Sequence, residues 1–435
     1  MKKTIQFSIL ILMALIWGSC SNDDNAPSAP IIDPSQQNQA PAQFDLLTVG
    51  NTSINIDVLP ELTWETATDP EGDTVTYTIL LDTNTNPQNR IANDISSTSF
   101  TIGERLDLNT TYYWKVRATD SNNNSTDSEI FSFSTRNLEA TLLTINADFS
   151  PRVLFAASVF QNKIWVIGGR GPDGSFVTDR NDIWSSEDGL TWTLEVEEAP
   201  FSKRSGLNSV VFQQKLWVIG GFDSSVGSRN DVWSSTNGID WTLEIEEANI
   251  PGLNGHELIV FNNRLWIIGG TSNFSLQRKV WSSADGINWV EEVAETPFSS
   301  RRTASTVFDG KLWVISGVQV TSTDLSDVWS SNNGVDWTLE IENAPFLPKA
   351  DHTVVSFVDQ LWVLAGASEN PNPEADDFLS NTVWGSMNGT DWNMVPDAMQ
   401  FPERAGHKSV LFNGGILLFG GVGEDGFLND VWFLN

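Results

Sequence analysis

The sequence predicts an all-β protein in which a six-bladed β-propeller follows a smaller β-sandwich. One repeated pattern carries most of this prediction. Ahead of the repeats, short alternating strands separated by turn residues are typical of a sandwich. A repeat of about 40 to 50 residues is typical of one four-stranded propeller blade. Six apolar runs each end at a glycine, and successive final glycines are 47 to 55 residues apart: Gly169, Gly221, Gly270, Gly317, Gly366 and Gly421.

Four antiparallel strands, a to d, are predicted in each repeat from its local pattern. In the second copy, strand a covers Asn208–Phe212, and strand b is the continuous apolar run Leu216–Ile219, as expected for a strand buried on both faces. Strand c contains Trp233 and strand d begins at Trp241. The Asn-Gly or Asp-Gly step between c and d supplies residues that tolerate positive φ, which a tight turn between twisted strands needs.

The repeat resembles that of Kelch-type β-propellers, with a basic residue before strand a, Gly-Gly after strand b, Asn-Asp before strand c and a tryptophan in strand d. In the second copy these are Arg204, Gly220-Gly221, Asn230-Asp231 and Trp241. The resemblance covers residues 138–435 and implies a Kelch-like propeller. It indicates the fold strongly and the function weakly.

The last blade is predicted to be completed by the other end of the chain. Residues 422–435 have room for a loop and strand c but not for strand d. Residues 140–145 align with strand d of the other copies, so we expect this segment to pair into the sixth blade. Such pairing closes the ring and removes an exposed sheet edge.

The excess of acidic side chains disfavours some binding partners. The chain has 435 residues, with 56 acidic and 24 basic side chains and a formal net charge of −32. Nucleic acid and anionic surfaces are therefore disfavoured partners. Many carboxylates alternate along strand d, as Glu244 and Glu246 do, which is typical of protection against edge-to-edge association.

The N-terminus has the pattern of an exported protein. Residues 1–19 combine Lys2-Lys3 with the apolar run Ile5–Trp17, which predicts a signal peptide. Cys20 is the only cysteine and follows two small residues. This pattern resembles the bacterial lipoprotein site, which implies lipidation of Cys20 and anchoring to the outer membrane, with exposure at the cell surface as one option. The alternative is a secreted protein with a free cysteine. Residues 20–42 are polar and proline-containing, which predicts a disordered tether.

Residues 43–136 are predicted to form the sandwich. The segment resembles fibronectin type III domains, with Trp64 as a core residue and Tyr112 as the corner tyrosine, and we expect it to act as a spacer. Asp69, Glu71 and Asp73 lie in one turn and could hold calcium. No complete ligand set at a known spacing accompanies them, so a solvated turn is the favoured interpretation.

Two enzyme classes with propeller folds are argued against. Copper radical oxidases need a tyrosine cross-linked to cysteine, whereas the only tyrosines are Tyr77, Tyr112 and Tyr113, all in the sandwich, and Cys20 is at the lipidation site. The turn at Ser235–Trp241 resembles a shortened sialidase Asp-box, but the propeller lacks the tyrosine nucleophile of that family.

The propeller histidines and tryptophans are interpreted as packing residues. His256, His352 and His407 each lie five residues before the last phenylalanine of strand a, so they share one repeat position on three blades. A ligand role for them remains the alternative. No metal, cofactor or catalytic residue is assigned.

The best candidates for ligand binding lie at the end of the propeller where the long b–c loops and the d–a connections meet. Basic residues gather there, and in a strongly acidic protein they could receive carboxylates of acidic peptides or sugars. The alternative is that each pairs with a nearby Asp or Glu. The predicted rim set is Arg152, Arg204, Arg301, Arg302, Lys349, Arg404, Arg170, Arg180, Arg229 and Arg278.

Three functions follow as hypotheses. The first is a lipid-anchored envelope protein that binds a protein or glycan at the loop-rich face, with membrane contact through its lipid only. The second is a metal-independent sugar-modifying enzyme of the N-acetylneuraminate epimerase type, which predicts a deep funnel with a buried carboxylate of perturbed pKa beside an arginine. The third is a structural component of an envelope complex. The oligomeric state is left open.

Overall fold

A computed structural model of the chain describes residues 38–319, 325–346, 349–368, 378–395 and 400–435. The predicted signal peptide, Cys20 and most of the predicted tether lie outside these residues. The described residues form β-strands and no helix. This described part of the chain therefore contains no helix that could span a membrane.

The N-terminal part forms two β-sheets that enclose an aromatic core. Trp64 and Trp114 are fully buried, and the rings of Trp64 and Tyr77 meet edge to face with centroids 5.4 Å apart. The Tyr112 side chain is also buried, and its hydroxyl donates to Asp107 Oδ2 at 3.1 Å. One sheet has the order β1 (Leu46–Thr48), β3 (Glu61–Trp64), β6 (Ser99–Thr101). The other has the order β2 (Ser53–Ile56), β9 (Phe131–Thr135), β7 (Thr111–Thr119), β4 (Thr76–Asp82), β5 (Arg90–Ile95), with β8 (Ser125–Asp127) beside β7.

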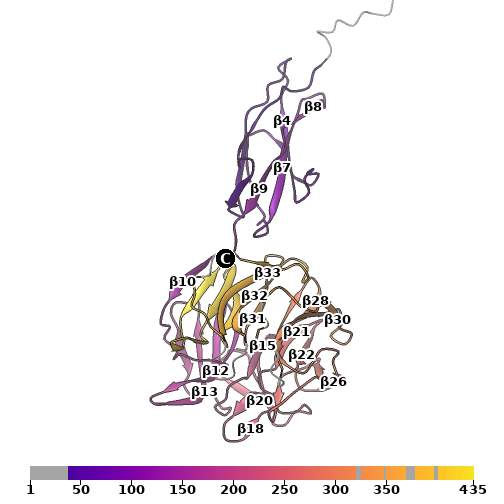
Figure 1. Ribbon diagram of the computed structural model, residues 1–435. Coiled ribbons are helices and arrows are strands. Elements are labelled where there is room, and N and C mark those ends of the chain that lie inside the picture. The colour runs from indigo at the N-terminus through magenta and orange to yellow at the C-terminus, as the bar shows by residue number, and fades with distance from the viewer. Residues whose placement is uncertain (1–37, 320–324, 347–348, 369–377, 396–399) are drawn as a thin grey trace, which may run out of the picture.

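The C-terminal part is a β-propeller built from six four-stranded antiparallel sheets among the described residues (Figure 1). Sheet 1 is β11 (Ala156–Phe160), β12 (Lys163–Asp173), β13 (Phe176–Ser186), β14 (Thr193–Val196). Sheet 2 is β15 (Asn208–Phe212), β16 (Lys215–Ile219), β19 (Val232–Ser235), β20 (Trp241–Ile245). Sheet 3 is β21 (Glu257–Phe261), β22 (Arg264–Ile268), β25 (Val280–Ser283), β26 (Trp289–Val293).

The remaining three sheets continue the same order. Sheet 4 is β27 (Arg302–Phe308), β28 (Lys311–Val318), β29 (Leu325–Ser331), β30 (Thr338–Ile341). Sheet 5 is β31 (Thr353–Phe357), β32 (Gln360–Ser368), β33 (Phe378–Ser386), β34 (Asn393–Met394). Sheet 6 is β35 (Lys408–Phe412), β36 (Gly415–Phe419), β39 (Val431–Leu434) and β10 (Ala140–Thr144). In sheet 6, β10 pairs antiparallel with β39, so the first and last strands of the propeller lie side by side.

The sheets pack against one another through repeated glycine–tryptophan contacts. A Cβ added to Gly238, in the c–d turn of sheet 2, would lie 2.3 Å from the ring of Trp165 in sheet 1. Gly286 meets Trp217 in the same way, and that indole donates to Phe212 O at 3.0 Å. The turn glycines therefore serve close packing as well as positive φ. This agrees with the interpretation of the propeller tryptophans as packing residues.

The sandwich stands on one end of the propeller, beside the C-terminal strand (Figure 1). Gln360 Nε2, at the a–b turn of sheet 5, donates to Leu108 O of the sandwich at 2.8 Å. Arg105 lies over the Phe357 ring, with 5.2 Å from its Cζ to the ring centroid. One buried apolar cluster runs from the sandwich core into sheets 5 and 6. The two parts therefore share a packed interface at the end of the propeller that carries the a–b and c–d turns.

Candidate functional site in the central cavity

Four of the predicted rim arginines are buried in ion pairs. Arg204 donates through Nη1 to Asp231 Oδ1 at 2.6 Å and through Nη2 to Asp231 Oδ2 at 2.9 Å, and only 1% of its side chain is exposed. Burial raises the pKa of Asp231, but the hydrogen bonds and charge of Arg204 outweigh it and the pKa falls below its usual value. The same pairing joins Arg152 to Asp182, Arg301 to Asp327 and Arg404 to Asp430.

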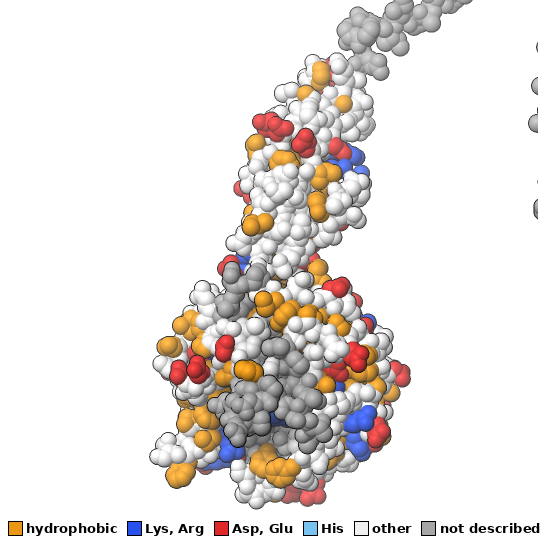
Figure 2. All heavy atoms as spheres, in the orientation of Figure 1, with side chains coloured by type: hydrophobic (Ala, Val, Ile, Leu, Met, Phe, Trp, Pro, Cys, Tyr) orange, Lys and Arg blue, Asp and Glu red, His pale blue; other side chains and the backbone are white. Residues whose placement is uncertain are grey.

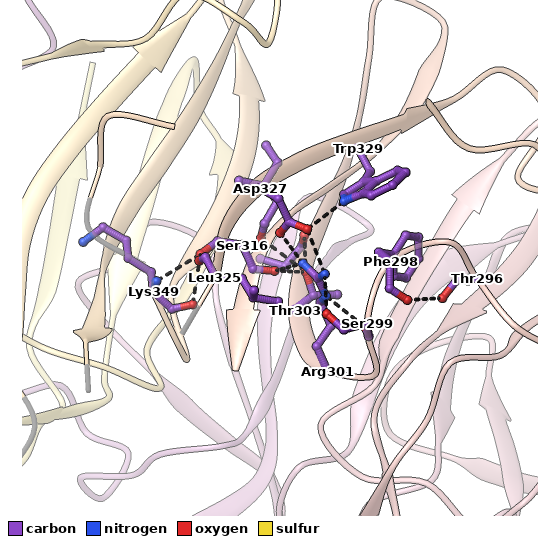
Figure 3. Close-up of polar contacts among 12 residues, drawn as sticks. Thr296, Phe298, Ser299, Arg301, Thr303, Ser316, Leu325, Asp327, Trp329 and Lys349 are labelled. Carbon is purple, nitrogen blue, oxygen red and sulfur yellow. Dashed lines mark hydrogen bonds and ion pairs between the residues drawn. The ribbon is translucent and has the colours of Figure 1, made fainter. Parts of the chain in front are cut away.

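These pairs tie the segment before strand a to the start of strand c of the same sheet. Arg301 lies between Ser299, Ser316 and the Asp327 carboxylate, which also accepts from the Trp329 indole (Figure 3). The prediction of Arg152, Arg204, Arg301 and Arg404 as ligand-binding groups is therefore wrong, and local pairing is correct. The reason is geometric. Each arginine meets an aspartate at the start of strand c of its own sheet, and both side chains are buried inside the propeller.

Lys349 takes the place of the arginine in sheet 5. Its ammonium group is buried and donates to the hydroxyls of Ser380 and Thr382, at 3.1 and 3.2 Å. Thr382 stands where sheets 1, 2, 4 and 6 have the aspartate. Burial lowers the pKa of Lys349 to about 8. Lys349 is thus interior too, and its prediction as a rim group is corrected.

The other five predicted rim residues remain at least partly exposed. Arg170 lies 3.8 Å from Asp179 and keeps 41% of its side chain exposed. Arg180, Arg229 and Arg278 are half-buried, and none of them forms an ion pair with a carboxylate among the described residues. Arg302 differs from these four because it lines the central cavity.

The innermost strands β11, β15, β21, β27, β31 and β35 each contact the next, and β35 contacts β11, so they form a closed ring. A cavity of about 290 Å³ lies inside this ring. It is lined by the first residues of the strands and by the segments before them, such as Gly206 and Gly406. Those segments pair with the b–c hairpins, so the cavity lies at the loop-rich end of the propeller, away from the sandwich.

Glu257 and Lys408 are charged residues of the ring strands that face this cavity, as is Arg302 at the start of β27. Glu257 and Lys408 occupy the same position, the first residue of the innermost strand, in sheets 3 and 6, which are opposite each other in the ring. The Glu257 carboxylate accepts from Ser305 N at 3.2 Å and from Ser305 Oγ at 2.9 Å. The exposed part of the Glu257 side chain faces the cavity, and protein surrounds the rest of the side chain. This burial raises the pKa of Glu257, against the charge of Lys408 and the Ser305 hydrogen bonds.

Hydroxyl groups and one ion pair complete the cavity wall. In this wall the hydroxyls of Thr353 and Ser409 share a hydrogen bond of 2.7 Å, and the Ser209 hydroxyl shares one of the same length with Ser158, which does not line the cavity. Arg302 lies 3.6 Å from Asp351, and each side chain is about one third exposed. The wall is therefore polar and carries charges of both signs, with many groups that can both donate and accept hydrogen bonds.

The three histidines are buried side chains that also line this cavity. Burial is the main cause that lowers the pKa of His256 to about 4 and of His352 to about 3, and it lowers the pKa of His407 well below its usual value. All three are therefore neutral near pH 7. His407 Nε2 bonds to Thr353 Oγ1 at 2.9 Å and His352 Nε2 to Ile315 O at 3.1 Å. Both ring nitrogens of His256 lack a hydrogen-bond partner among the described residues.

Converging metal-ligand atoms occur in one place among the described residues, and it is not the propeller. In the sandwich, carboxylate oxygens of Asp69, Asp73 and Asp120 lie within 4.8 Å of one another. The predicted calcium group contained Glu71 in place of Asp120. Glu71 instead accepts from Gln39 at 3.1 Å. Asp120 comes from the loop after β7, a contact that residue spacing could not indicate.

Sequence reasoning missed Glu257 and Lys408, although a signal was present. At the corresponding position the other four copies have Ala156, Asn208, Ala304 and Thr353, all uncharged. Two charged residues at a repeat position that is uncharged in the other copies could have indicated a functional site. The basic series before strand a drew attention instead, because arginine is usually an exposed residue.

Fold and comparisons together define the class: a β-propeller protein with an N-terminal immunoglobulin-like domain. The chain belongs to the family described as the DUF6242 beta propeller domain, whose model matches residues 188–433. Residues 49–139 match a second family, described as the Rha78A-like, N-terminal immunoglobulin domain.

One similar solved structure is that of YjhT. It shares 17% sequence identity with this chain, with a TM-score of 0.55, and the match covers 66% of this chain and 96% of the other. At this identity the likeness shows a shared fold alone. No curated protein matches the chain.

Proposed function

We propose that this protein is a lipid-anchored binding protein of the bacterial cell envelope, and that its propeller binds a small acidic sugar in the central cavity. In this proposal the propeller is six-bladed and Kelch-like, the fibronectin type III-like sandwich is a spacer, and Cys20 carries the lipid at the outer membrane. The observation that carries the proposal is the placement of Lys408 and Glu257 on opposite sides of one cavity without an ion pair between them.

The wall chemistry supports this ligand class. Lys408 supplies a cation for a carboxylate, and the hydroxyls of Ser209, Ser305 and Ser409 suit sugar hydroxyls, which also both donate and accept. A cavity of about 290 Å³ is at the small end of ligand pockets. This size favours a monosaccharide or the end of a glycan chain over a polysaccharide segment.

The position of the sandwich supports a binding role as well. The sandwich contacts the propeller at Gln360, at the opposite end from the cavity. A lipid on Cys20 would therefore be connected to the end of the propeller that faces away from the cavity mouth. The cavity would remain accessible to ligands outside the membrane.

Calorimetric titration of the purified full chain with hexuronic acids, sialic acids and their neutral counterparts tests the proposal. We expect acidic sugars to bind, and Lys408→Met to weaken binding by about tenfold or more, because a charge-assisted hydrogen bond is lost. Lys203→Met is the matched control, since Lys203 is exposed and pairs with Glu198 at 3.4 Å. Equal affinity for neutral and acidic sugars, or no effect of Lys408→Met, would contradict the proposal.

A second candidate function is a sugar-modifying enzyme of the epimerase type. It is favoured by the raised pKa of Glu257, because a raised pKa makes the carboxylate a better proton acceptor than an ordinary carboxylate. In such a reaction Glu257 would take a proton from a sugar carbon and Lys408 would stabilise the negative charge left on the adjacent carbonyl oxygen. After the planar intermediate has turned over in the cavity, the Glu257 carboxyl group would return a proton to the other face of that carbon.

Proton exchange separates this enzyme from a binding protein. In D₂O, an epimerase substrate gains deuterium at one carbon, which NMR detects. We expect Glu257→Gln to reduce exchange about 100-fold or more while binding persists. Binding without any exchange in the unsubstituted protein would reject the enzyme and leave the binding proposal intact.

A further inference from the structure

Three b–c hairpins of neighbouring sheets carry exposed apolar side chains at their tips. Phe176 lies at the β12–β13 tip of sheet 1, with 76% of its surface exposed. Val226 lies between β17 (Phe222–Asp223) and β18 (Gly227–Ser228) of sheet 2 with 67% exposed. Phe274 lies between β23 (Thr271–Ser272) and β24 (Ser275–Leu276) of sheet 3 with 83% exposed. We call these three tips together the apolar crest.

The crest is one continuous surface because each hairpin contacts its neighbour. The Ser224 hydroxyl donates to Asp179, which joins the hairpin of sheet 2 to that of sheet 1. The ring of Phe274 meets that of Phe222 edge to face with centroids 6.0 Å apart, which joins sheets 3 and 2. Exposed apolar side chains gathered in one place mark an interaction surface more often than scattered ones do.

Each crest residue is followed on its own hairpin by an arginine, three or four residues later: Arg180, Arg229 and Arg278. None of these guanidinium groups has a carboxylate partner among the described residues. Counted back from the strand c tryptophan, Arg180 and Arg229 share one position, at which sheets 3 to 6 have Gln277, Leu325, Ser380 and Leu428, and Arg278 stands one residue later. Figure 2 shows hydrophobic side chains beside Lys and Arg over the hairpins of sheets 1 and 2.

We propose that the apolar crest with Arg180, Arg229 and Arg278 is a docking surface for an acidic polypeptide whose carboxylates alternate with apolar side chains. Phenylalanine and arginine together are the residues enriched at protein interfaces. The guanidinium groups have no carboxylate partner in the described chain and would favour carboxylates of a ligand. The exposed apolar side chains would pack against apolar groups, which a sugar or a nucleic acid lacks.

This surface is distinct from the central cavity. It uses the hairpin tips, whereas the cavity uses the innermost strands, and no crest residue lines the cavity. The proposal therefore does not depend on the sugar-binding proposal. Lys408→Met should leave docking unchanged, and crest substitutions should leave sugar binding unchanged.

Short synthetic peptides test the proposal by fluorescence anisotropy with the full chain. One series alternates Glu with Leu or Phe, a second replaces Glu by Lys, and a third replaces the apolar residues by Ser. We expect only the first series to bind, with affinity falling as salt rises. Phe274→Ser and the double variant Arg229→Gln/Arg278→Gln should each weaken binding about tenfold or more. Ile54→Ser is the control, because Ile54 is equally exposed (77%) on β2 of the sandwich.

The contrary outcomes are specific. Failure of the first series to bind, or equal binding of the acidic and basic series, would overturn the proposal. Binding that Phe274→Ser and Ile54→Ser weaken equally would place the contact elsewhere. Sedimentation of the full chain with phosphatidylcholine–phosphatidylglycerol vesicles, lost in Phe274→Ser, would identify the crest as a lipid contact and also overturn it.

Discussion

Glu257 on β21 and Lys408 on β35, both within the described residues, face one cavity from opposite sheets and form no ion pair. The free-energy cost of partly removing each charge from water is not offset by a direct ion pair, because the two groups are too far apart. A pair held apart in this way is suited to a ligand that lies between the two groups. The same separation makes the state of Glu257 sensitive to pH.

Replacing Glu257 should change stability in a pH-dependent way. Because its folded pKa is raised, the folded state favours the protonated form, and stability falls as pH rises from the ordinary carboxyl pKa through the folded pKa. Glu257→Gln should therefore raise the free energy of unfolding near pH 7 and have little effect near pH 4. Urea unfolding at both pH values measures this. A larger stabilisation at the lower pH would contradict the prediction.

Breaking a buried Arg–Asp pair should destabilise the propeller strongly. Arg204→Ala leaves the Asp231 carboxylate buried without its partner, which we expect to cost about 3–5 kcal/mol of unfolding free energy. Denaturant unfolding followed by tryptophan fluorescence measures the loss. Arg170→Ala is the control, because Arg170 is 41% exposed and should change stability by about 0.5 kcal/mol or less. Equal effects of the two substitutions would show that Asp231 does not need its partner.

Restoring the repeated pair in sheet 5 should stabilise the protein. Lys349→Arg with Thr382→Asp recreates the bidentate pairing of sheets 1, 2, 4 and 6. Lys349→Arg alone leaves a buried cation without a carboxylate, and Thr382→Asp alone gives a carboxylate without the two parallel hydrogen bonds of a guanidinium group. We expect a favourable coupling of about 1–3 kcal/mol in the double-mutant cycle. An additive cycle would indicate that the site cannot adopt the geometry of the other sheets.

Lys349 itself predicts a rise in stability at alkaline pH. Its folded pKa is about 8, below the ordinary lysine value of 10.5, so the unfolded chain binds its proton more tightly. Stability should therefore rise as pH increases from about 8 to about 10.5, and Lys349→Met should abolish this part of the pH dependence. Thermal unfolding of both proteins across this range measures it. The same slope in both proteins would exclude Lys349 as its source.

Turn glycines should differ according to their neighbours. Gly238→Ala combines a φ of +78° with a Cβ position 2.3 Å from Trp165, so we expect a loss of about 3 kcal/mol or more. Gly310→Ala has a similar φ of +66° but no atom within 4 Å of the added Cβ, so about 1 kcal/mol is expected. Denaturant unfolding of the two variants isolates the packing cost. Equal losses of unfolding free energy would show that the positive φ alone accounts for the effect at Gly238.

The local structure could be predicted from particular residues because each repeat states its own pattern. The apolar run Leu216–Ile219 matches β16 closely, and the turn at Asn237-Gly238 lies between β19 and β20. Residues 140–145 could be aligned with strand d because the neighbouring residues repeat as well. These inferences needed only short-range spacing, which the chain carries directly.

The roles of charged residues could not be predicted in the same way. Arg204 and Asp231 are 27 residues apart and meet inside sheet 2, so the type of residue suggested exposure where the fold imposes burial. Arg302 was included among the rim residues and does reach the cavity, but Glu257 and Lys408 were not singled out. Asp120 joins Asp69 and Asp73 only because two loops of the sandwich meet.

The sequence by itself determined the strands, their turns and the repetition of one unit, because those depend on residues close together in the chain. Only the tertiary structure decided which charges are interior and which face a ligand. The arrangement of the sheets in a ring places sheet 3 opposite sheet 6, and so places Glu257 opposite Lys408. This arrangement places residues about 150 positions apart around one cavity, and no local pattern encodes it.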